Sequence, residues 1–441
     1  MKRISQRVLL LAGLSLALWC LGAGADDTPT QPFITSADKI SAGDTAWMLS
    51  STALVLLMTI PGLALFYAGM VRQKNVLSTA LQSFAVCCLV TVLWVVIGYS
   101  LAFTPGTAFI GGFSRVLLGG MSYVKSTGML SVSHIAPTIP ESVFVMFQMT
   151  FAIITPALIT GAFAERIKFG SMLLFMALWS LLVYAPVAHC VWEPTGWLAA
   201  LGDQDFAGGT VVHINAGAAG LMCAFVLGKR NGYGREAFVP HNLTFTLIGA
   251  SLLWVGWFGF NAGSAVAADG RAGMAMLVTQ LATATAALTW MFVEWAFRKR
   301  ASLLGGCSGA VAGLVAITPA SGFVDVSGAL AIGLVAGGLC YWGATGLKRL
   351  LDADDSLDVF GIHGIGGMVG AILTGVFSQK DLSGASADLA IQTLGAFATL
   401  FYSAAVSLIL LLAIQATIGL RVKPADETLG LDLSQHGETI P

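Results

Sequence analysis

Long apolar runs alternate with short polar segments along almost the whole chain. Eleven of these runs are long enough to cross a hydrocarbon core about 30 Å thick. They cover residues 45–70, 76–103, 141–164, 169–190, 210–228, 240–262, 272–296, 302–318, 326–347, 361–378 and 394–420. The pattern predicts an all-α polytopic membrane protein with eleven transmembrane helices. Pro61, Pro156 and Pro186 fall inside these runs, where we expect kinks.

The basic residues predict how these helices are oriented. Most Lys and Arg residues lie in alternate loops, at residues 72–74, 166–168, 229–235, 298–300, 348–349 and 421–423. Cytoplasmic loops of membrane proteins carry such an excess of positive charge. We therefore expect the N-terminus outside and the C-terminus inside, with the polar segment 421–441 as a cytoplasmic tail.

The first 25 residues have the features of a secretory signal peptide. Lys2, Arg3 and Arg7 precede an apolar run that ends at Ala23-Gly24-Ala25, and a small-residue site of this kind is typical of cleavage. Cys20 raises the alternative of a lipoprotein signal, although the bulky Trp19 before it is unfavourable for one. We expect cleavage after Ala25, which leaves residues 26–420 as one membrane domain.

The composition agrees with a membrane bundle and excludes several other classes. Hydrophobic residues make up 56% of the chain and charged residues 10%, and there are 52 glycines; soluble domains have about 25% charged residues. Small residues allow close helix packing in lipid. The scattered cysteines have no C-x-x-C spacing, so neither a disulfide framework nor a zinc site is expected. No metal, cofactor or nucleic-acid surface is predicted.

A repeated pattern relates the two halves of the chain. Two histidines near the starts of the fifth and tenth runs each begin the pattern H-x-x-x-G-x-x-G, and an Asp and a Phe lie upstream of each, at Asp205-Phe206 and at Asp358-Val359-Phe360. Each half has five spans, so the second half enters the membrane from the opposite side and the two halves are inverted repeats, followed by one final helix. Binding sites in such folds lie near the midplane of the membrane. The two copies are His213/Gly217/Gly220 and His363/Gly367/Gly370.

His213 and His363 are the polar exceptions in an apolar core that is nearly free of charge. A single histidine could simply be bonded to a neighbouring carbonyl, but two at repeat-equivalent positions favour a site, and we expect them to meet. A permanently charged, strongly hydrated metal ion would face a large desolvation cost there. A species that can become neutral would not, and imidazole can exchange hydrogen bonds or protons with it.

Aromatic and hydroxyl side chains could form an entrance to this site. Phe147 and Phe151 are four residues apart on one helical face, as are Phe260 and Ser264, and Trp192 lies at the outer end of the fourth run. Aromatic rings attract cations, and a hydroxyl can accept a hydrogen bond from a donor-rich cation. Ordinary packing is the competing interpretation of these aromatic pairs.

Six further stretches carry a family resemblance. They read "PGLALFYAGMVRQKNVLS", "GAFAERIKF", "DFAGGTVVHINAG", "GWFGFNAGSA", "SLLGGCSGAVAGLVAITPA" and "DVFGIHGIGG". With them the chain strongly resembles the ammonium transporter family, the Amt/Mep/Rh proteins, and in particular its bacterial Amt branch. The similarity covers essentially the whole mature chain.

The resemblance implies a homotrimer with one pathway per subunit and assigns roles to nine residues. It implies an outer recruitment site formed by Phe147, Trp192 and Ser264, and beneath it a gate formed by Phe151 and Phe260. It implies a twin-histidine pair formed by His213 and His363, with Gln148 as a polar residue near that pair and Asp205 as an acidic scaffold residue.

The function implied is ammonium transport across the bacterial inner membrane, with methylammonium as an analogue and a cytoplasmic PII signalling protein as a possible partner. We expect net transport to be electrogenic. An ammonium sensor and a neutral-gas channel for ammonia or carbon dioxide remain alternatives, although no output domain is expected after the tail. An intramembrane hydrolase is disfavoured because the sequence has neither H-E-x-x-H nor G-x-S-x-G.

Overall fold

The computed structural model describes residues 29–440, and the chain from Gln31 onward forms one compact helical unit. The predicted signal peptide lies outside the described residues. Apolar segments in lipid must satisfy their own backbone hydrogen bonds, which is why each long apolar run forms a helix. Ten helices among the described residues are long and apolar enough to cross a membrane.

The first half of the bundle contains five of these spans. They are α2 (Ala42–Leu57) with α3 (Ala64–Met70), α4 (Val76–Leu93) with α5 (Tyr99–Phe103), α6 (Glu141–Phe163), α7 (Phe169–Trp179) with α8 (Ala185–Trp192) and the short α9 (Trp197–Leu201), and a π-helical turn (Gly209–Ile214) that leads into α10 (Asn215–Leu227).

The second half repeats this plan and adds a final helix. Its members are α11 (Leu243–Gly263), α12 (Gly270–Arg298), α13 (Leu303–Ile317), α14 (Val326–Trp342) with α15 (Lys348–Leu350), a second π-helical turn (Phe360–Gly364) that leads into α16 (Ile365–Phe377), the short α17 (Lys380–Ser383), and α18 (Leu389–Thr417).

Each of the eleven predicted runs contains a helix, but the run at 302–318 differs from the others. Its helix, α13, has only 15 residues, which is fewer than the other ten spans have. Pro319 follows Thr318, the residue that caps the end of α13. A proline disfavours helical backbone in the residue before it and so ends the helix there.

The three prolines inside the apolar runs have different effects. Ile60, directly before Pro61, has non-helical backbone angles of φ −129° and ψ 107° and separates α2 from α3. Pro186 lies directly after a π-helical turn (Ser180–Tyr184) within the continuous helix Phe169–Leu201, and local π-helical adjustment is one way in which a membrane helix accommodates proline. The helix α6 stays continuous through Pro156, so no break occurs at this third position.

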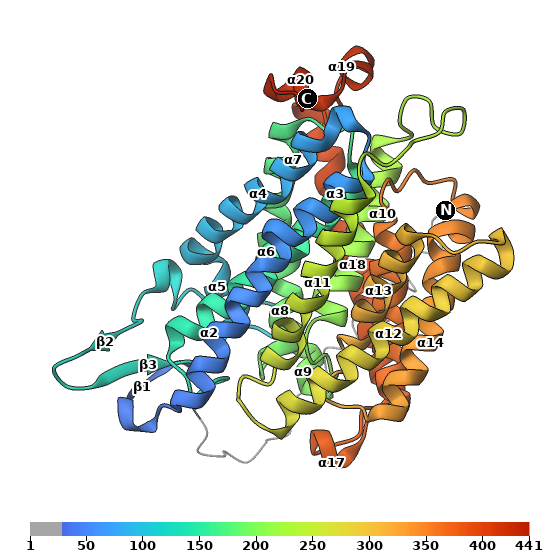
Figure 1. The fold of residues 1–441 in the computed structure, drawn as a ribbon. Helices are drawn as coiled ribbons and strands as arrows, with labels where there is room; N and C mark the ends of the chain where they lie inside the picture. Colours follow the sequence, from blue (N-terminus) through green and yellow to red (C-terminus); the bar gives the residue numbers. More distant parts are fainter. Residues whose placement is uncertain (1–28, 441) are drawn as a thin grey trace, which may run out of the picture. The chain divides into compact units, whose positions relative to one another are not determined.

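The sequence pattern missed a small antiparallel sheet. It consists of β1 (Phe33–Ser36), β2 (Tyr123–Val124) and β3 (Met129–Val132) in the order β1-β3-β2. Figure 1 places this sheet at one end of the bundle and the helices α19 (Pro424–Leu429) and α20 (Leu431–His436) at the other. We call these the sheet end and the tail end.

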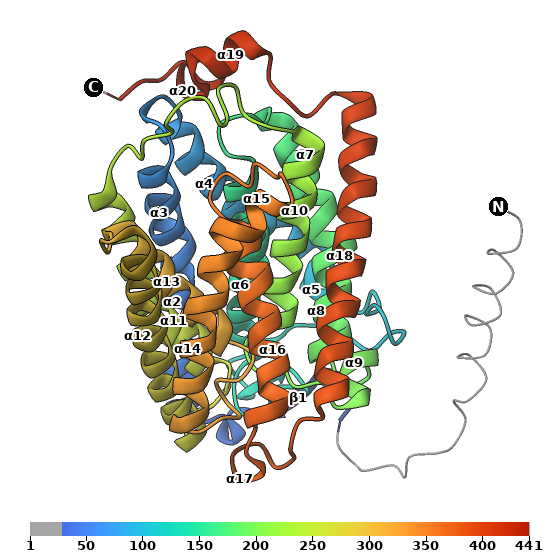
Figure 2. The ribbon, with the colours of Figure 1, turned by 90° about the vertical axis from the view of Figure 1, so that its right-hand side faces the viewer.

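The tail, residues 421–440, lies across the tail end without entering the bundle (Figure 2). The Asp432 carboxylate accepts hydrogen bonds from the backbone N–H groups of Leu77 and Ser78, at 3.0 and 2.7 Å, which are free donors at the start of α4. Glu427 accepts one from the N–H of Asn231 at 2.6 Å. The tail is therefore fixed by its own carboxylates to the start of α4 and to the loop after α10.

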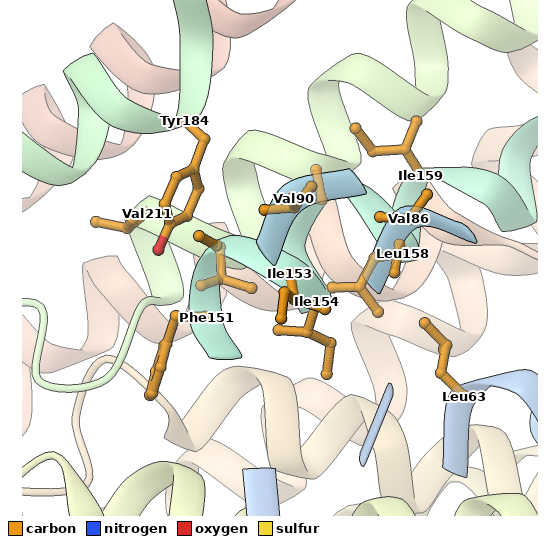
Figure 3. Packing of buried hydrophobic residues seen from close by; sticks show 14 of the residues in the cluster. Leu63, Val86, Val90, Phe151, Ile153, Ile154, Leu158, Ile159, Tyr184 and Val211 are labelled. Carbon is orange, nitrogen blue, oxygen red and sulfur yellow. The ribbon is translucent and has the colours of Figure 1, made fainter. Parts of the chain in front are cut away.

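The helix α6 forms the centre of the first half. Nearly every residue of α6 is buried, and Figure 3 shows Ile153, Ile154 and Leu158 of this helix among Val86 and Val90 of α4. Because α6 has few contacts with solvent or lipid, neighbouring helices constrain the side chains along it from all sides. It is thus a rigid support for the aromatic residues at its sheet end.

Candidate functional site

The helix that carries His213 is fixed at its start by Asp205. The two carboxylate oxygens of Asp205 accept four backbone hydrogen bonds, from the N–H groups of Gly208, Gly209, Thr210 and Val211, at 2.6 to 3.0 Å. Four free N–H groups at a helix start are a natural site for a carboxylate. Burial nevertheless raises the pKa of the Asp205 carboxyl above its usual value.

The equivalent carboxylate in the second half is Asp355, which corrects the pairing predicted from the sequence. Asp355 precedes His363 by the same eight residues that separate Asp205 from His213, and its Oδ2 accepts a bond from the N–H of Phe360 at 2.7 Å. Asp358 instead pairs with Lys348 at 2.8 Å. Burial raises the pKa of the Asp355 carboxyl to about 6.

Glycines allow the two histidine-bearing segments to cross closely. A Cβ atom on Gly217 would lie 2.4 Å from Cα of Gly364, and one on Gly367 would lie 3.0 Å from the backbone nitrogen of Ile214. These two contacts are reciprocal, since each joins a glycine of one half to the histidine-bearing segment of the other. Both histidines lie within π-helical turns, which are frequent at functional sites.

The predicted meeting of the histidines is observed. Nδ1 of His213 and Nδ1 of His363 are 3.2 Å apart, and the ring planes differ by 22°. Both side chains are buried, and Nε2 of His213 has no hydrogen-bond partner among the described residues. One hydrogen between the two Nδ1 atoms leaves the other nitrogens available to a molecule passing along the rings.

His213 and His363 line a cavity of about 10 Å³, which is large enough for about one water molecule. The other side chains that line the cavity are apolar or aromatic, among them Ile154, Leu158 and Val311, and no described lining residue is charged. Trp257 lies beside His213, with ring centroids 5.4 Å apart. The cavity can accept a small neutral molecule that forms hydrogen bonds, and it offers a permanent cation no counter-charge.

Two stacked phenylalanines lie beside this cavity, and one of them, Phe260, lines it. The rings of Phe151 and Phe260 have centroids 4.2 Å apart and planes 29° apart, and both are buried. Phe260 also lies over His213 at 6.1 Å. The order along this line is therefore Phe151, Phe260, His213 and His363.

The remaining predicted aromatic residues lie on the sheet-end side of the two phenylalanines. Phe147 packs edge-on against Phe151 at 5.0 Å, and Trp192 does so at 5.8 Å. The indole N–H of Trp192 donates to the backbone carbonyl of Asp205 at 2.8 Å. Asp205 thus holds the helix start that carries His213 and, through its carbonyl, the orientation of Trp192.

Ser264 and Gln148 complete the predicted set. The Ser264 hydroxyl donates to the carbonyl of Phe260 at 2.8 Å, so its oxygen can still accept a hydrogen bond. Gln148 is half-buried, and its Oε1 accepts no hydrogen bond. It adjoins Phe147 in α6, three residues before Phe151, and its closeness to the histidine pair stays a prediction.

A second carboxyl near the outer aromatic residues was not identified from the sequence. Asp203 is buried, both of its oxygens lack a hydrogen-bond partner among the described residues, and they pack against Gly395 of α18. Burial, and then the neighbouring Asp205, raise the pKa of Asp203 well above its usual value. An acidic residue two positions before Asp205 gave no helical or repeat signal.

Among residues 29–440 no group of three or more His, Cys, Asp and Glu side chains could hold a metal ion. The site thus consists of an aromatic cluster, a phenylalanine pair and a histidine pair along one line. The aromatic rings lie on one side of the phenylalanine pair, and the uncharged cavity with its two imidazoles lies on the other.

Comparison with known proteins identifies the family. The model of the Ammonium Transporter Family matches residues 46–440. The ammonium transporter of Bacillus subtilis is 47% identical over 405 residues, which cover 90% of this chain and 98% of the relative. The crystal structure of Candida albicans Mep2 superposes with a TM-score of 0.82 at 35% identity, covering 91% of each chain.

A structure described as a sensor Amt protein is also similar, with a TM-score of 0.82 at 28% identity over 89% of this chain and 98% of that one. The relatives are transporters rather than enzymes. With the family model spanning nearly the whole described chain, the protein belongs to the Ammonium Transporter Family and is a multi-pass membrane protein that transports ammonium.

Proposed function

We propose that this protein recruits ammonium as a cation at the sheet end, separates it from one proton and conducts it as ammonia past the histidine pair. The observation that carries the proposal is the change in chemistry across the two stacked phenylalanines. On one side Trp192 and Phe147 surround Phe151; on the other lies an uncharged cavity with two imidazoles.

Recruitment of the cation rests on three side chains. The faces of Trp192 and Phe147 supply the negative part of the aromatic quadrupole, worth about 0.5–2 kcal/mol for each well-placed cation. The Ser264 oxygen accepts a hydrogen bond from the ammonium N–H, because its own hydrogen is engaged by the carbonyl of Phe260. Asp205 does not need to bind the cation: its carbonyl orients Trp192, and its carboxylate fixes the start of the helix that carries His213.

Conduction past the phenylalanines requires loss of a proton. Carrying a full charge into the cavity would incur a desolvation cost that no carboxylate on its lining offsets. Ammonia can instead accept a hydrogen bond from, or donate one to, the imidazole nitrogens that face the cavity. A potassium ion cannot release a proton and finds no adequate set of oxygen ligands, so the same cavity excludes it.

We propose that the separated proton also crosses, so that net transport is electrogenic. The histidine pair, which can pass a proton between its ring nitrogens, is the group that supports this part of the proposal. The test is current evoked by ammonium or methylammonium in proteoliposomes. A current that follows the ammonium gradient supports the proposal, whereas ammonia flux without current would assign a neutral-gas channel.

The proposal includes the orientation and the assembly of the protein. We propose eleven spans that include α13, a cleaved signal peptide of residues 1–25, and insertion in the bacterial inner membrane with the sheet end outside and the tail inside. Three copies form a closed trimer with one pathway each, an arrangement favoured for identical subunits. A detergent-corrected mass equal to one subunit would contradict the trimer.

The fixed tail is the basis for the proposed partner. A cytoplasmic PII signalling protein would meet the surface formed by residues 421–440 and the loops to which Asp432 and Glu427 attach. Pull-down with PII proteins, with and without nucleotide, tests this association. The likeness to a sensor Amt protein makes signalling a second candidate, which ammonium binding without measurable flux would favour.

A further inference from the structure

His189 lies behind the aromatic cluster, and the mechanism above does not use it. Its ring is completely buried in α8, three residues before Trp192. Nδ1 lies 3.1 Å from the carbonyl oxygen of Ala102, and Nε2 lies 2.8 Å from the carbonyl oxygen of Thr107. Both ring nitrogens therefore face groups that can only accept a hydrogen bond.

This arrangement determines the protonation state that satisfies the ring. A neutral imidazole has one N–H and one lone pair, so one of the two carbonyls would face a lone pair; an imidazolium donates from both nitrogens. Ala102 belongs to the last turn of α5, where free carbonyls and the helix dipole favour a positive charge. The two acceptor carbonyls and the helix dipole favour the doubly protonated ring, and they oppose the cost of burying its charge.

Two neighbouring carbonyls at this end of α5 already have partners. The carbonyl of Ser100 accepts from the hydroxyl of Thr104 at 2.7 Å, and the carbonyl of Leu101 accepts from the N–H of Gly111 at 2.7 Å. His189 thus supplies the partner that remains for Ala102. By reaching Thr107 as well, the same ring holds the turn that follows α5 against α8.

The connection to the recruitment site is short. Phe103, the residue after Ala102, stacks on Trp192 with ring planes 10° apart and centroids 6.4 Å apart. The helices α5 and α8 are therefore joined by two adjacent contacts, from His189 to Ala102 and from Trp192 to Phe103. Loosening the first contact changes the support of the second, and with it the position of the Trp192 face.

Other ionisable groups surround this contact. Glu193, the residue after Trp192, interacts electrostatically with His189 and contacts His134 at 3.2 Å. On the side of α5 the ionisable groups are Tyr99, Glu141 and Arg115, which are bonded to one another, and on the side of α18 they are Cys190 and Tyr402. Of these, His134 is the second imidazole near Trp192, and its substitution is the matched control.

We propose that His189 is a positioning residue for ammonium recruitment, which in its doubly protonated form ties α5 to α8 and holds Trp192 in place. The inference rests on the proposed function of the aromatic cluster. Loss of the ring proton leaves one carbonyl without a donor, and the affinity for ammonium falls while the conduction step past the histidine pair is unchanged.

The test measures ammonium-evoked current against ammonium concentration at several external pH values between about 5.5 and 7.5, where histidine titrates. In the wild type we expect KM to rise with pH by about threefold or more, with little change in the maximal current. His189→Gln, which can donate but cannot titrate, should have a raised KM at acidic pH and no dependence of KM on pH. His134→Gln is the matched control and should keep the wild-type profile.

Two results would overturn the inference. One is a His189→Gln variant with the KM and pH profile of the wild type; the other is a variant that lowers only the maximal current. His189→Phe, which has no donor, should give a higher KM than His189→Gln, and failure of this second variant to assemble leaves the test with His189→Gln intact. A wild type without ammonium current contradicts the proposed function itself and is recognised before any variant is compared.

Discussion

Gly217 lies so close to Gly364 that a Cβ atom on Gly217 would be 2.4 Å from Cα of Gly364. Backbone atoms cannot turn aside as a flexible side chain can, so Gly217→Ala must push the two histidine-bearing segments apart. We expect a loss of about 1–3 kcal/mol in stability, with reduced ammonium uptake. Thermal unfolding in detergent together with uptake measures both effects.

Gly338→Ala is the matched control for this substitution. Gly338 is also helical, in α14, and a Cβ there would meet nothing within 4 Å. The Gly338→Ala variant should unfold at the wild-type temperature or slightly above it, because alanine has a higher helix propensity than glycine. Equal effects of both substitutions would contradict a specific role for the approach at Gly217.

Asp205→Ala removes the acceptor of four backbone N–H groups at the start of the helix that carries His213. Uptake should be abolished although Asp205 need not contact the substrate, because both the helix start and the support of Trp192 change. Radiolabelled methylammonium uptake measures this, with trimer formation checked in parallel. Normal uptake in an assembled Asp205→Ala variant would leave Asp205 only the role of a loop charge.

Asp203 predicts a pH dependence of stability. Because its pKa is raised in the folded protein, folding favours the protonated form, and stability is lost as pH rises from the ordinary carboxyl value of roughly 4 toward the raised one. Asp203→Asn keeps the shape without the titration and should flatten this part of the profile. The melting temperature from about pH 4 to pH 8 is the measurement, and parallel profiles for both proteins would count against it.

Charges at the tail end predict the opposite trend. Arg230 pairs with Asp354 at 2.8 Å and with Glu165 at 3.2 Å, and the pKa values of both carboxyls are lowered. Their contribution is present above roughly pH 4 and is lost as pH falls through the lowered values. Arg230→Gln should therefore cost more stability at neutral pH than near pH 3, which denaturant unfolding at the two pH values tests.

The sequence predicted the spans and the histidine pair because both depend on strong one-dimensional signals. Long apolar runs have few structural alternatives in lipid, and the repeat around His213 and His363 required a common site. The sheet was missed because its strands are only two to four residues long, too short for a clear alternation of polar and apolar positions. Asp355 was missed because Asp358 is nearer to His363 in the sequence. The hydrogen bond from Phe360 identifies Asp355, and not Asp358, as the carboxylate at the start of this helix.

The role of His189 depends on contacts between distant segments. The side chain of His189 joins residues 87 and 82 positions away, and no periodicity in the chain marks those carbonyls as unsatisfied. The fixed tail is similar, since Asp432 finds its partners more than 350 residues away in sequence. Such contacts follow from the packed structure and not from local patterns.

The central claim is that the contact between His213 and His363, 3.2 Å apart at Nδ1, makes the cavity selective for a species that can lose its proton. The most direct test is the current evoked by ammonium and by potassium in proteoliposomes for the wild type, His213→Asp and His363→Asp. An aspartate, if ionised, would supply the counter-charge that the cavity lacks and could stabilise a permanent cation. We predict that both variants still pass ammonium and begin to pass potassium; variants that keep the ammonium current and still exclude potassium would show that the histidines only pack.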